Sequence, residues 1–502
     1  LARQGVPPGL IAGILTDATW GISAHVLDQS NPTEYAWRQV ERALQQVDKA
    51  EVDPRGRRVL DPSAPLDTAR RLRDELFPHS IHTNDDFLEY ERGAYRTVED
   101  ATMRSAVWAA LGVSVIRKVT RGAVTFEPFR PGPGQVSSVL DALKGLAHQP
   151  ADRMAPPVWL DGEGPPPGEI ISCRNGLLHV PTAELLAPTP RFLTRNALDL
   201  DFNPDAPEPV AWQAFVAAVF PDADAAALLQ EWFGYYLLPD TSQEKMLLMV
   251  GPPRSGKGTI QKVLTELVGR TNVCAPSIKS LGGNFGLQPM IGKQVAFLSD
   301  IRIGSGSDRA AITETLLRIT GRDDVTADRK NKEAWTGRLA VRFFIATNEM
   351  PSLSDNSPAL ANRFVPLLLE RSFLGKEDPT LADRLIKELP GILNWSLVGW
   401  RRLRDRGHFS LPAASKEAIG EIMELGSPVA AFIRDTCHVA PGHRVEKERL
   451  FAAWQRWCEA NNLAPGRMEH FARSLRAVTS HQVDSARPSI DGQRRLVGSP
   501  AK

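Results

Sequence analysis

One segment constrains the possible fold of this chain more than any other feature. It is Gly251–Thr259, which reads Gly-Pro-Pro-Arg-Ser-Gly-Lys-Gly-Thr. It follows the apolar run Met246–Val250, which predicts a buried strand. Apolar residues at helical spacing then predict a helix that begins at Thr259, namely Ile260, Val263, Leu264 and Leu267. A loop of this kind between a strand and a helix binds phosphate, because its backbone N–H groups and the helix dipole favour an anion.

The loop indicates a nucleoside triphosphate, ATP, and Mg²⁺ as cofactors. Lys257 would reach the β- and γ-phosphates. A Mg²⁺-binding hydroxyl usually follows the lysine, but Gly258 stands there, so the hydroxyl would come from Thr259. A Gly/Pro turn that merely contains Gly-Lys is the alternative, and the surrounding strand and helix argue against it. The residues expected to bind the nucleotide are Gly251, Pro252, Pro253, Arg254, Ser255, Gly256, Lys257, Gly258 and Thr259.

The overall charge of the 502 residues excludes little. The chain has 60 Lys and Arg side chains against 59 Asp and Glu, a formal net charge of +1. This balance leaves nucleic acid open as a partner, because a local basic channel would suffice. No apolar stretch approaches the ~20 residues that cross a bilayer, so we expect no membrane partner. The four cysteines form no C-x-x-C pair, so neither a zinc site nor a disulfide framework is expected, and a reducing, cytoplasmic location fits.

Composition and periodicity divide the chain into five predicted regions. Residues 1–65 read as a helical module with a linker, and residues 70–240 as mixed α/β with loops rich in Gly and Pro. Residues 241–375 alternate apolar strands with helices, the pattern of a parallel sheet. Residues 376–425 read as a helical connector, and residues 426–502 as a compact helical unit that ends in strand-like segments. The predicted fold class is therefore α/β.

Three polar residues mark the ends of apolar strands beyond the loop. Asp300 ends a run that begins at Val295, where an ATPase places a carboxylate directed at Mg²⁺. Asn348 ends a run that begins at Val341, where a polar side chain orients the attacking water. Arg363 opens another apolar strand, where it could stabilise charge on the phosphoryl group of a neighbouring subunit. A capping aspartate, a turn-forming asparagine and a surface arginine are the respective alternatives.

A basic hairpin is predicted between the second and third of these strands. Residues 320–335 read as a strand, a charged tip and a return strand, with Arg329, Lys330 and Lys332 on the tip. In a ring of subunits, such tips would line a channel and grip a phosphate backbone. A solvated charged turn is the alternative, since it is the usual outcome for a run of charges.

The last region predicts two helices and a basic strand pair. Residues 446–461 read as an amphipathic helix whose Trp454 and Trp457 are expected in the core, and residues 468–478 read as a second helix. A helix followed by a basic wing is how a winged helix meets duplex DNA. A protein-docking module of the same shape is the alternative. The basic residues expected to contact DNA here are Arg473, Arg476, Arg494 and Arg495.

The order of these features along the chain resembles that of the superfamily 3 helicases, a branch of the AAA+ ATPases. The features are the loop, the strand that ends in an acid, the basic hairpin, the strand that ends in asparagine, and the arginine. The resemblance is stronger still to the phage and plasmid primase–helicases related to the poxvirus primase–helicase. Residues 173–180 and 229–238 look like the domain that precedes the motor in that family. Residues 427–433 open a segment similar to its winged-helix domain, and residues 21–26 resemble the helical module behind a primase domain.

The resemblance implies an AAA+ P-loop ATPase core with a mixed α/β N-terminal region and a C-terminal winged-helix domain. It implies a homo-hexamer that encircles single-stranded DNA at a replication fork and moves by hydrolysing ATP. It also implies a bacterial host cytoplasm and a gene carried by a phage or mobile element. Lys257 and Thr259 would bind phosphate and Mg²⁺. Asp300 would be the Walker B acid, Asn348 the sensor, and Arg363 the arginine finger that acts in trans.

One departure from the family concerns the general base. The family often has two adjacent acids at the end of the second strand, one for Mg²⁺ and one for the attacking water. Here Asp300 is flanked by Ser299 and Ile301. Two possibilities stay open at this point: Asp300 acts alone, or a nearby acid such as Glu349 serves as the base.

Two other functions stay open beside the helicase. The Gly-Lys-Gly-Thr sequence also occurs in nucleotide kinases, although about 250 residues precede it here. An origin-binding or scaffold protein that ATP only switches between assembly states is the other alternative. Because the chain opens at Leu1 rather than Met, we expect a longer protein in which a primase domain precedes it. No paired-carboxylate polymerase site is visible, so we expect no primer synthesis by these residues.

Overall fold

The computed structural model describes most of the chain, and its contacts divide the chain into two units. The described residues are 1, 6–47, 52–120, 123–150, 155–299, 307–351, 358–426, 428–440, 442–461, 463–479, 483, 489–490 and 493–494. The first unit contains residues 1–91 and 95–155, and the second contains residues 92–94 and 156–502.

Residues 1–155 form mostly helices with short antiparallel strands. The elements are α1 (Pro8–Thr16), η2 (Gly21–Ser23), α2 (Ala24–Leu27), α3 (Pro32–Val47), α4 (Pro65–Leu76), β1 (Ile81–Thr83), β2 (Asp86–Glu91), β3 (Ala94–Val98), α5 (Asp100–Gly112), β4 (Val115–Thr120), β5 (Ala123–Pro128) and α6 (Pro133–Ala147). α1 packs on α3 through Ile11, Ala12 and Val40. α4, α5 and α6 share a separate apolar core. Each of α4 and α6 begins with a proline, which fits the first turn because its N–H groups lack intrahelical acceptors.

A helix that crosses a bilayer needs about 20 consecutive apolar residues. Among the described residues, no single helix is both long and apolar enough to cross a membrane. Pro8–Thr16 and Gly21–Leu27 reach that length and composition only when joined, and the two are bent by 85°.

The second unit is built on a five-stranded sheet in which every neighbouring pair is parallel. Its strands, in spatial order, are β12 (Val273–Cys274), β13 (Val295–Ser299), β16 (Arg342–Thr347), β11 (Met246–Val250) and β17 (Phe364–Leu368). β11, which precedes the phosphate loop, therefore lies between β16 and β17, two strands that come later in the chain. The predicted α/β class with a parallel sheet is confirmed.

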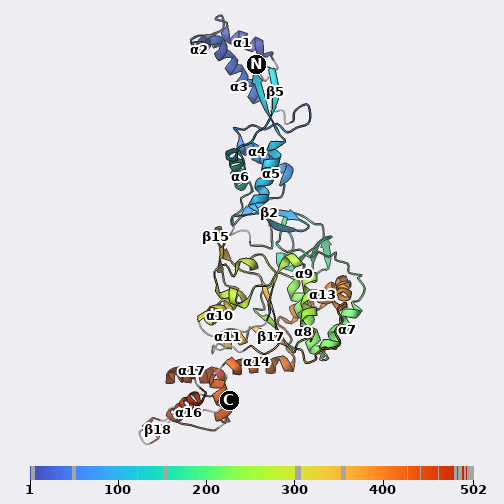
Figure 1. Ribbon diagram of the computed structural model, residues 1–502, viewed down its shortest axis with the longest axis vertical. Helices are drawn as coiled ribbons and strands as arrows, with labels where there is room; N and C mark the ends of the chain where they lie inside the picture. The colour runs from blue at the N-terminus through green and yellow to red at the C-terminus, as the bar shows by residue number, and fades with distance from the viewer. Residues whose placement is uncertain are drawn as a thin grey trace. The chain divides into compact units, whose positions relative to one another are not determined.

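Helices cover both faces of this sheet, which explains why its strands are mainly apolar rather than alternating. Leu247 and Met249 pack on the side of α8 (Ala223–Leu237), α9 (Lys257–Val268) and α13 (Leu389–Arg406). Met246 and Leu248 pack on the opposite side, with α10 (Ser307–Thr320), α11 (Pro358–Ala361) and α14 (Ala413–Gly426). Figure 1 shows α10 on one side of the sheet and α9 and α13 on the other.

The remaining elements of this unit surround the sheet. They are β6 (Val158–Trp159), β7 (Ile170–Cys173), β8 (Gly176–His179), β9 (Glu184–Leu186), β10 (Phe192–Leu193), α7 (Val210–Val219), β14 (Val325–Arg329), β15 (Lys332–Gly337) and α12 (Leu381–Ile386), together with the short 3₁₀ turns η4 (Pro167–Glu169), η5 (Arg270–Asn272), η6 (Ile278–Gly282) and η7 (Gln288–Met290). α8 is fixed to the sheet by the buried Arg342, whose Nη2 donates to the Tyr236 carbonyl oxygen over 2.7 Å. Burial lowers the pKa of Arg342 to about 10, so the guanidinium stays charged at neutral pH.

α8 and α13 approach so closely that two glycines are required. A Cβ on Gly234 would lie 2.4 Å from the Ser396 carbonyl oxygen, and one on Gly399 would lie 2.2 Å from that of Gln230. This close packing brings Glu231, which is 0% exposed, against the arginines of α13.

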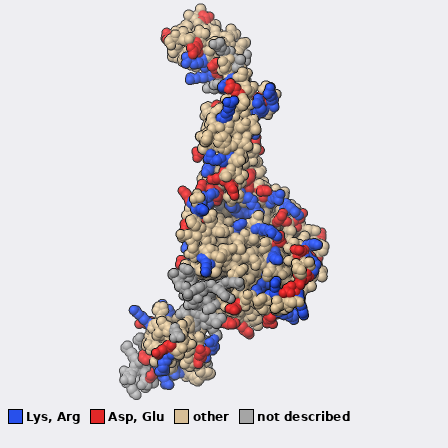
Figure 2. All heavy atoms as spheres, viewed as in Figure 1, with Lys and Arg blue, Asp and Glu red and all other residues tan. Residues whose placement is uncertain are grey.

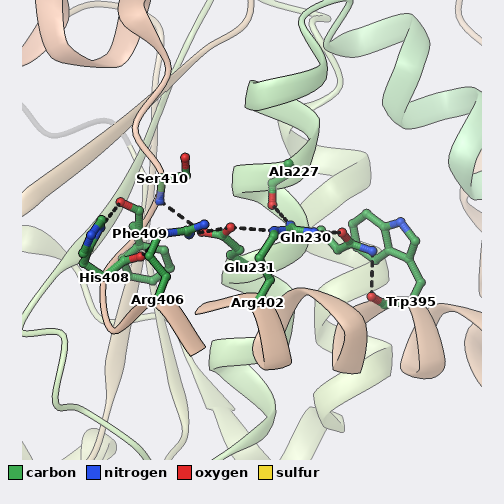
Figure 3. A network of polar contacts seen from close by, with 9 residues as sticks. All are labelled: Ala227, Gln230, Glu231, Trp395, Arg402, Arg406, His408, Phe409 and Ser410. Atoms are coloured by element: carbon green, nitrogen blue, oxygen red, sulfur yellow. Dashed lines mark hydrogen bonds and ion pairs between the residues drawn. The ribbon is translucent and has the colours of Figure 1, made fainter. Parts of the chain in front are cut away.

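The Glu231 carboxylate is the centre of a polar network between α8 and α13 (Figure 3). Its Oε1 accepts from Arg402 Nε at 2.8 Å and forms an ion pair with Arg406 Nη2 at 2.7 Å. Its Oε2 accepts from the Ser410 backbone N–H at 3.2 Å. Arg402 also donates from Nη1 to Gln230 Oε1 at 2.9 Å and from Nη2 to the Ala227 carbonyl at 2.7 Å. One buried carboxylate thus fixes both helices and the segment after α13.

We expect Glu231→Ala to destabilise the fold strongly. The substitution leaves two partly buried arginines without their shared buried anion, a change that costs about 2–3 kcal/mol once solvent screening of the partly exposed arginines is counted. Calorimetry should show a melting temperature lower by several degrees. The matched control is Asp201→Ala, because Asp201 pairs with Arg174 while both side chains stay more than half exposed. That variant should melt close to the unmodified chain, and equal melting of the two variants would contradict this role for Glu231.

The end of the chain forms a small helical group with its own core. Its elements are α15 (Pro428–Thr436), α16 (Lys447–Ala460), α17 (Met468–Val478), β18 (Ser489–Ile490) and β19 (Gln493–Arg494). The two helices predicted in this region are confirmed, α17 with identical bounds. Trp454 is buried and Trp457 is partly buried against the buried Phe432, so both belong to the core as expected. The two-stranded pair that follows is antiparallel.

Candidate functional site

The phosphate loop leaves the carboxyl end of the central strand. The Val250 carbonyl accepts from Leu369 N at 2.8 Å, and Gly251 N donates to the Thr347 carbonyl at 3.3 Å. These bonds hold the start of the loop between the ends of β16 and β17. Ligands of open parallel sheets bind at this edge, beyond the carboxyl ends of the strands.

Two glycines give the loop its shape. A Cβ on Gly251 would lie 2.4 Å from the Leu369 carbonyl oxygen, so no side chain fits there. Gly256 has φ +102°, in the left-handed region, and acts as the N-cap of α9. Its carbonyl accepts the helical bond from Ile260 N at 3.0 Å. The prediction that the helix begins at Thr259 is therefore wrong by two residues: α9 begins at Lys257, because the positive φ of Gly256 ends the loop.

The Lys257 ammonium group lies inside the loop. Its Nζ donates to the Gly251 carbonyl at 2.6 Å, to the Pro252 carbonyl at 2.9 Å and to Ser255 Oγ at 3.2 Å. Thr259 lies two residues further along α9 and is partly exposed. A positive charge, the first N–H groups of a helix and a hydroxyl therefore belong to one short segment, which is the chemistry that a phosphate chain requires.

Residues that the sequence did not single out hold the loop from outside. Ser372 Oγ donates to the Pro253 carbonyl at 2.9 Å, and Phe373 N donates to the Arg254 carbonyl at 2.9 Å. On the other side, the ring of Phe215 lies 3.3 Å from the point that a Cβ on Gly256 would occupy. No spacing signal marks these contacts, because they join segments far apart in the chain.

Asn348 lies beside the start of the loop. β11 and β16 run parallel with Val250 opposite Thr347, so Asn348 and Gly251 follow at the same edge of the sheet, about one strand spacing of ~4.8 Å apart. Asn348 is exposed. The turn after it is fixed by Thr347, whose Oγ1 donates to the Glu349 carbonyl at 3.0 Å.

The predicted acid Asp300 lies outside the described residues. Ser299, the last residue of β13, pairs with Ala346 of β16, so β13 also ends at the edge that carries the loop. The role of Asp300 stays a prediction.

Arg363 lies at the opposite end of the strands, where their amino ends meet. It directly precedes β17, and its carbonyl accepts from Met246 N, the first residue of β11, at 2.7 Å. The five residues of β11 separate it from the loop by roughly 16 Å at ~3.3 Å per residue. The structure therefore brings Lys257 and Asn348 together at the carboxyl ends of the strands. It does not bring Arg363 to the loop of the same chain.

The predicted basic hairpin is present. β14 and β15 pair antiparallel, and the turn between them is formed by Lys330 and Asn331, the latter with φ +60°. Lys330 is exposed at the turn and Lys332 is partly exposed. The expected place of Arg329 on the tip is wrong: it is the last residue of β14 and only 7% exposed, because its Nε donates back to the Glu333 carbonyl at 2.8 Å.

The basic residues expected near the end of the chain are only partly described. Arg473 and Arg476 are exposed on α17. Arg494 is the last residue of β19, and Arg495 lies outside the described residues. On the face seen in Figure 2, basic and acidic side chains are interspersed, in keeping with the net charge of +1.

Comparisons with known proteins give weak likenesses. A family model described as a family of unknown function (DUF5906) matches residues 249–363, which begin in β11 and end at Arg363. A search of curated proteins finds no match. The apo C-terminal region of NrS-1 has a TM-score of 0.49 at 10% identity, and the match covers 87% of this chain and 99% of that chain. Its A-form apo structure has a TM-score of 0.46 at 10% identity, with 84% of this chain and 96% of that chain covered.

Proposed function

We propose that this chain is an ATP-driven DNA helicase of the AAA+ superfamily 3 type, which works as a homo-hexamer around single-stranded DNA at a replication fork. One observation carries the proposal. Lys257 and Asn348 lie at the carboxyl ends of the strands, and Arg363 lies at the amino ends. A nucleotide on the loop would therefore meet Arg363 only from another copy of the chain. This arrangement, together with the resemblance of the motifs, supports a ring with one nucleotide at each boundary.

The loop would hold the phosphates of ATP. Its N–H groups and the Lys257 ammonium group would take the β- and γ-phosphates. In the described part of the chain, no three His, Cys, Asp or Glu side chains gather to hold a metal ion. Mg²⁺ would be held by the phosphates and the Thr259 hydroxyl, with Asp300 as a further carboxylate. When bound, the ion would neutralise charge that develops on the phosphoryl oxygens.

Hydrolysis would combine groups from two copies. Asn348, beside Gly251, would orient a water molecule toward the γ-phosphate. Asp300 or Glu349 would take the proton of that water, and the exposed Glu349 directly follows Asn348. Arg363 of the neighbouring copy would stabilise the charge of the transferring phosphoryl group. The energy of each step would then be coupled to the boundary between subunits.

DNA would be held by the hairpin and by the end of the chain. The exposed Lys330 and the partly exposed Lys332 would contact phosphates of a single strand in the channel of the ring. Arg473, Arg476, Arg494 and Arg495 would contact duplex DNA through a winged-helix arrangement. The setting would be the cytoplasm of a bacterial host, with the gene carried by a phage or mobile element.

The hairpin offers a test of this function. We expect the unmodified chain to separate a forked duplex with ATP and Mg²⁺, and the Lys330→Ala/Lys332→Ala variant to bind single strands more weakly for every sequence. The logarithm of the binding constant should also depend less on the logarithm of salt, by about 0.7 for each phosphate that the variant no longer neutralises. Fluorescence anisotropy of a labelled oligonucleotide at several salt concentrations measures both quantities.

The control variant is Arg384→Ala, because Arg384 is an exposed arginine that pairs with Asp378 through Nη1 at 2.7 Å, outside the hairpin. Its affinity and salt dependence should equal those of the unmodified chain. Phosphoryl transfer to a nucleoside monophosphate without stimulation by DNA would favour a nucleotide kinase instead. Sequence-specific duplex binding with negligible hydrolysis would favour an ATP-switched scaffold.

A further inference from the structure

Arg363 is held by a residue 119 positions earlier in the chain. Its Nη1 donates to the backbone carbonyl oxygen of Glu244 at 3.2 Å and also contacts Oε2 of the same residue in an ion pair. Both atoms of Glu244 therefore act on one nitrogen of the guanidinium group. The two side chains are only partly exposed, 25% for Arg363 and 40% for Glu244.

The other side of the guanidinium group makes no hydrogen bond within the described residues. Among the described residues, every hydrogen bond of the Arg363 side chain runs through Nη1, and none runs through Nε or Nη2. Nη2 lies beside the turn at Gly321, 3.6 Å from the point that a Cβ there would occupy, and Asp323 Oδ2 lies 3.7 Å from the same point. A guanidinium group presents donors along two edges, and here one edge is bound while the other remains available for an acceptor.

The chain around Glu244 fixes its position relative to Arg363. Glu244 has φ +52°, and its N–H donates to the Thr241 carbonyl at 3.1 Å in a tight turn before β11. The next residue, Lys245, donates from Nζ to the Asn362 carbonyl oxygen. Partial burial, and then the nearby Arg363, lower the pKa of Lys245. Met246 N, one residue further, bonds the carbonyl of Arg363 itself.

We infer that Glu244 is a positioning residue for Arg363, which holds the guanidinium group so that its free edge can meet the phosphoryl group on a neighbouring copy. The inference rests on the proposed function, in which Arg363 acts in trans. A side chain fixed before the reaction loses little freedom in the transition state, and the preorganised charge then lowers the barrier. β11 would thus connect two nucleotide sites. The loop after β11 would bind one nucleotide, and Glu244, just before β11, would position Arg363 for the nucleotide on the neighbouring copy.

Three variants of the full chain test this role. Glu244→Ala should lower kcat for ATP roughly tenfold, because misplaced groups of this kind slow the reaction without weakening binding. KM for ATP should stay unchanged, since the loop of the neighbouring copy binds the nucleotide. Glu244→Gln keeps an acceptor oxygen and should restore part of the rate. Asp201→Ala is the matched control, because Asp201 also pairs with an arginine, Arg174, in a separate and more exposed ion pair, and this variant should turn over ATP normally.

Mixed rings separate this inference from the proposed function. Glu244→Ala mixed with Lys257→Ala should recover turnover, because some boundaries then combine an intact loop with a correctly held arginine. Glu244→Ala mixed with Arg363→Ala should not, because no copy in that mixture offers one. If Glu244→Ala alone turns over ATP as fast as the unmodified chain while Arg363→Ala is inactive, the inference is wrong and the proposed function stands. Normal turnover by Arg363→Ala would overturn both.

Discussion

Lys257→Ala should reduce ATP turnover at least about a hundredfold, the effect expected when one preorganised donor to developing charge is removed. The ammonium group donates to two carbonyl oxygens of its own loop and to Ser255 Oγ, so it is positioned before a phosphate arrives. Alanine removes the positive charge from the centre of the loop and leaves the helix dipole as the main attraction for the anion. Phosphate release at saturating ATP and Mg²⁺ measures the effect.

The control for this experiment lies on the same helix. Lys262 is exposed on α9, beyond the loop, and has no contact with it among the described residues. Lys262→Ala should hydrolyse ATP like the unmodified chain, and both variants should melt at nearly the same temperature. A Lys257→Ala variant that keeps more than a small fraction of the turnover would show that hydrolysis happens elsewhere.

Arg363→Ala should leave nucleotide binding intact and reduce hydrolysis roughly a thousandfold, the lower end of what an arginine finger contributes. The reason is the place of Arg363 in the fold. Arg363 directly precedes β17, at the end of the strands away from the loop, and it contacts Glu244 rather than Lys257. A group that acts mainly on the charge of the transition state contributes little to the binding of the nucleotide before reaction. Titration with a fluorescent nucleotide gives the affinity, and phosphate release gives the rate.

Local patterns in the sequence were sufficient for the elements that surround the site. The runs that became β11, β16 and β17 are mainly apolar, with Arg342 and Thr347 at the ends of β16, because helices cover both faces of the sheet, and such runs are visible without any structure. The hairpin and α17 were also visible, since each depends on neighbours only a few residues away. The start of α9 was misplaced because the φ of Gly256, which depends on the folded loop, decides it.

Contacts between distant segments could not be predicted in the same way. Arg329 was expected at the tip of the hairpin, but its guanidinium group bonds back to Glu333, and a run of charges does not reveal which member is buried. Glu231 meets Arg402 across 171 positions, and Glu244 meets Arg363 across 119. No periodicity in a single sequence connects such pairs, so the residues that support the site emerged only from the fold.

The measurement that tests the shared nucleotide site most directly is ATP turnover by a mixture of two inactive variants. Lys257→Ala lacks a working loop and keeps Arg363, whereas Arg363→Ala has the opposite defect. If one copy supplies the loop and its neighbour supplies the arginine, mixing the two before assembly restores part of the turnover that neither shows alone. Absence of any recovery in mixed hexamers, or normal turnover by Arg363→Ala alone, would contradict the account.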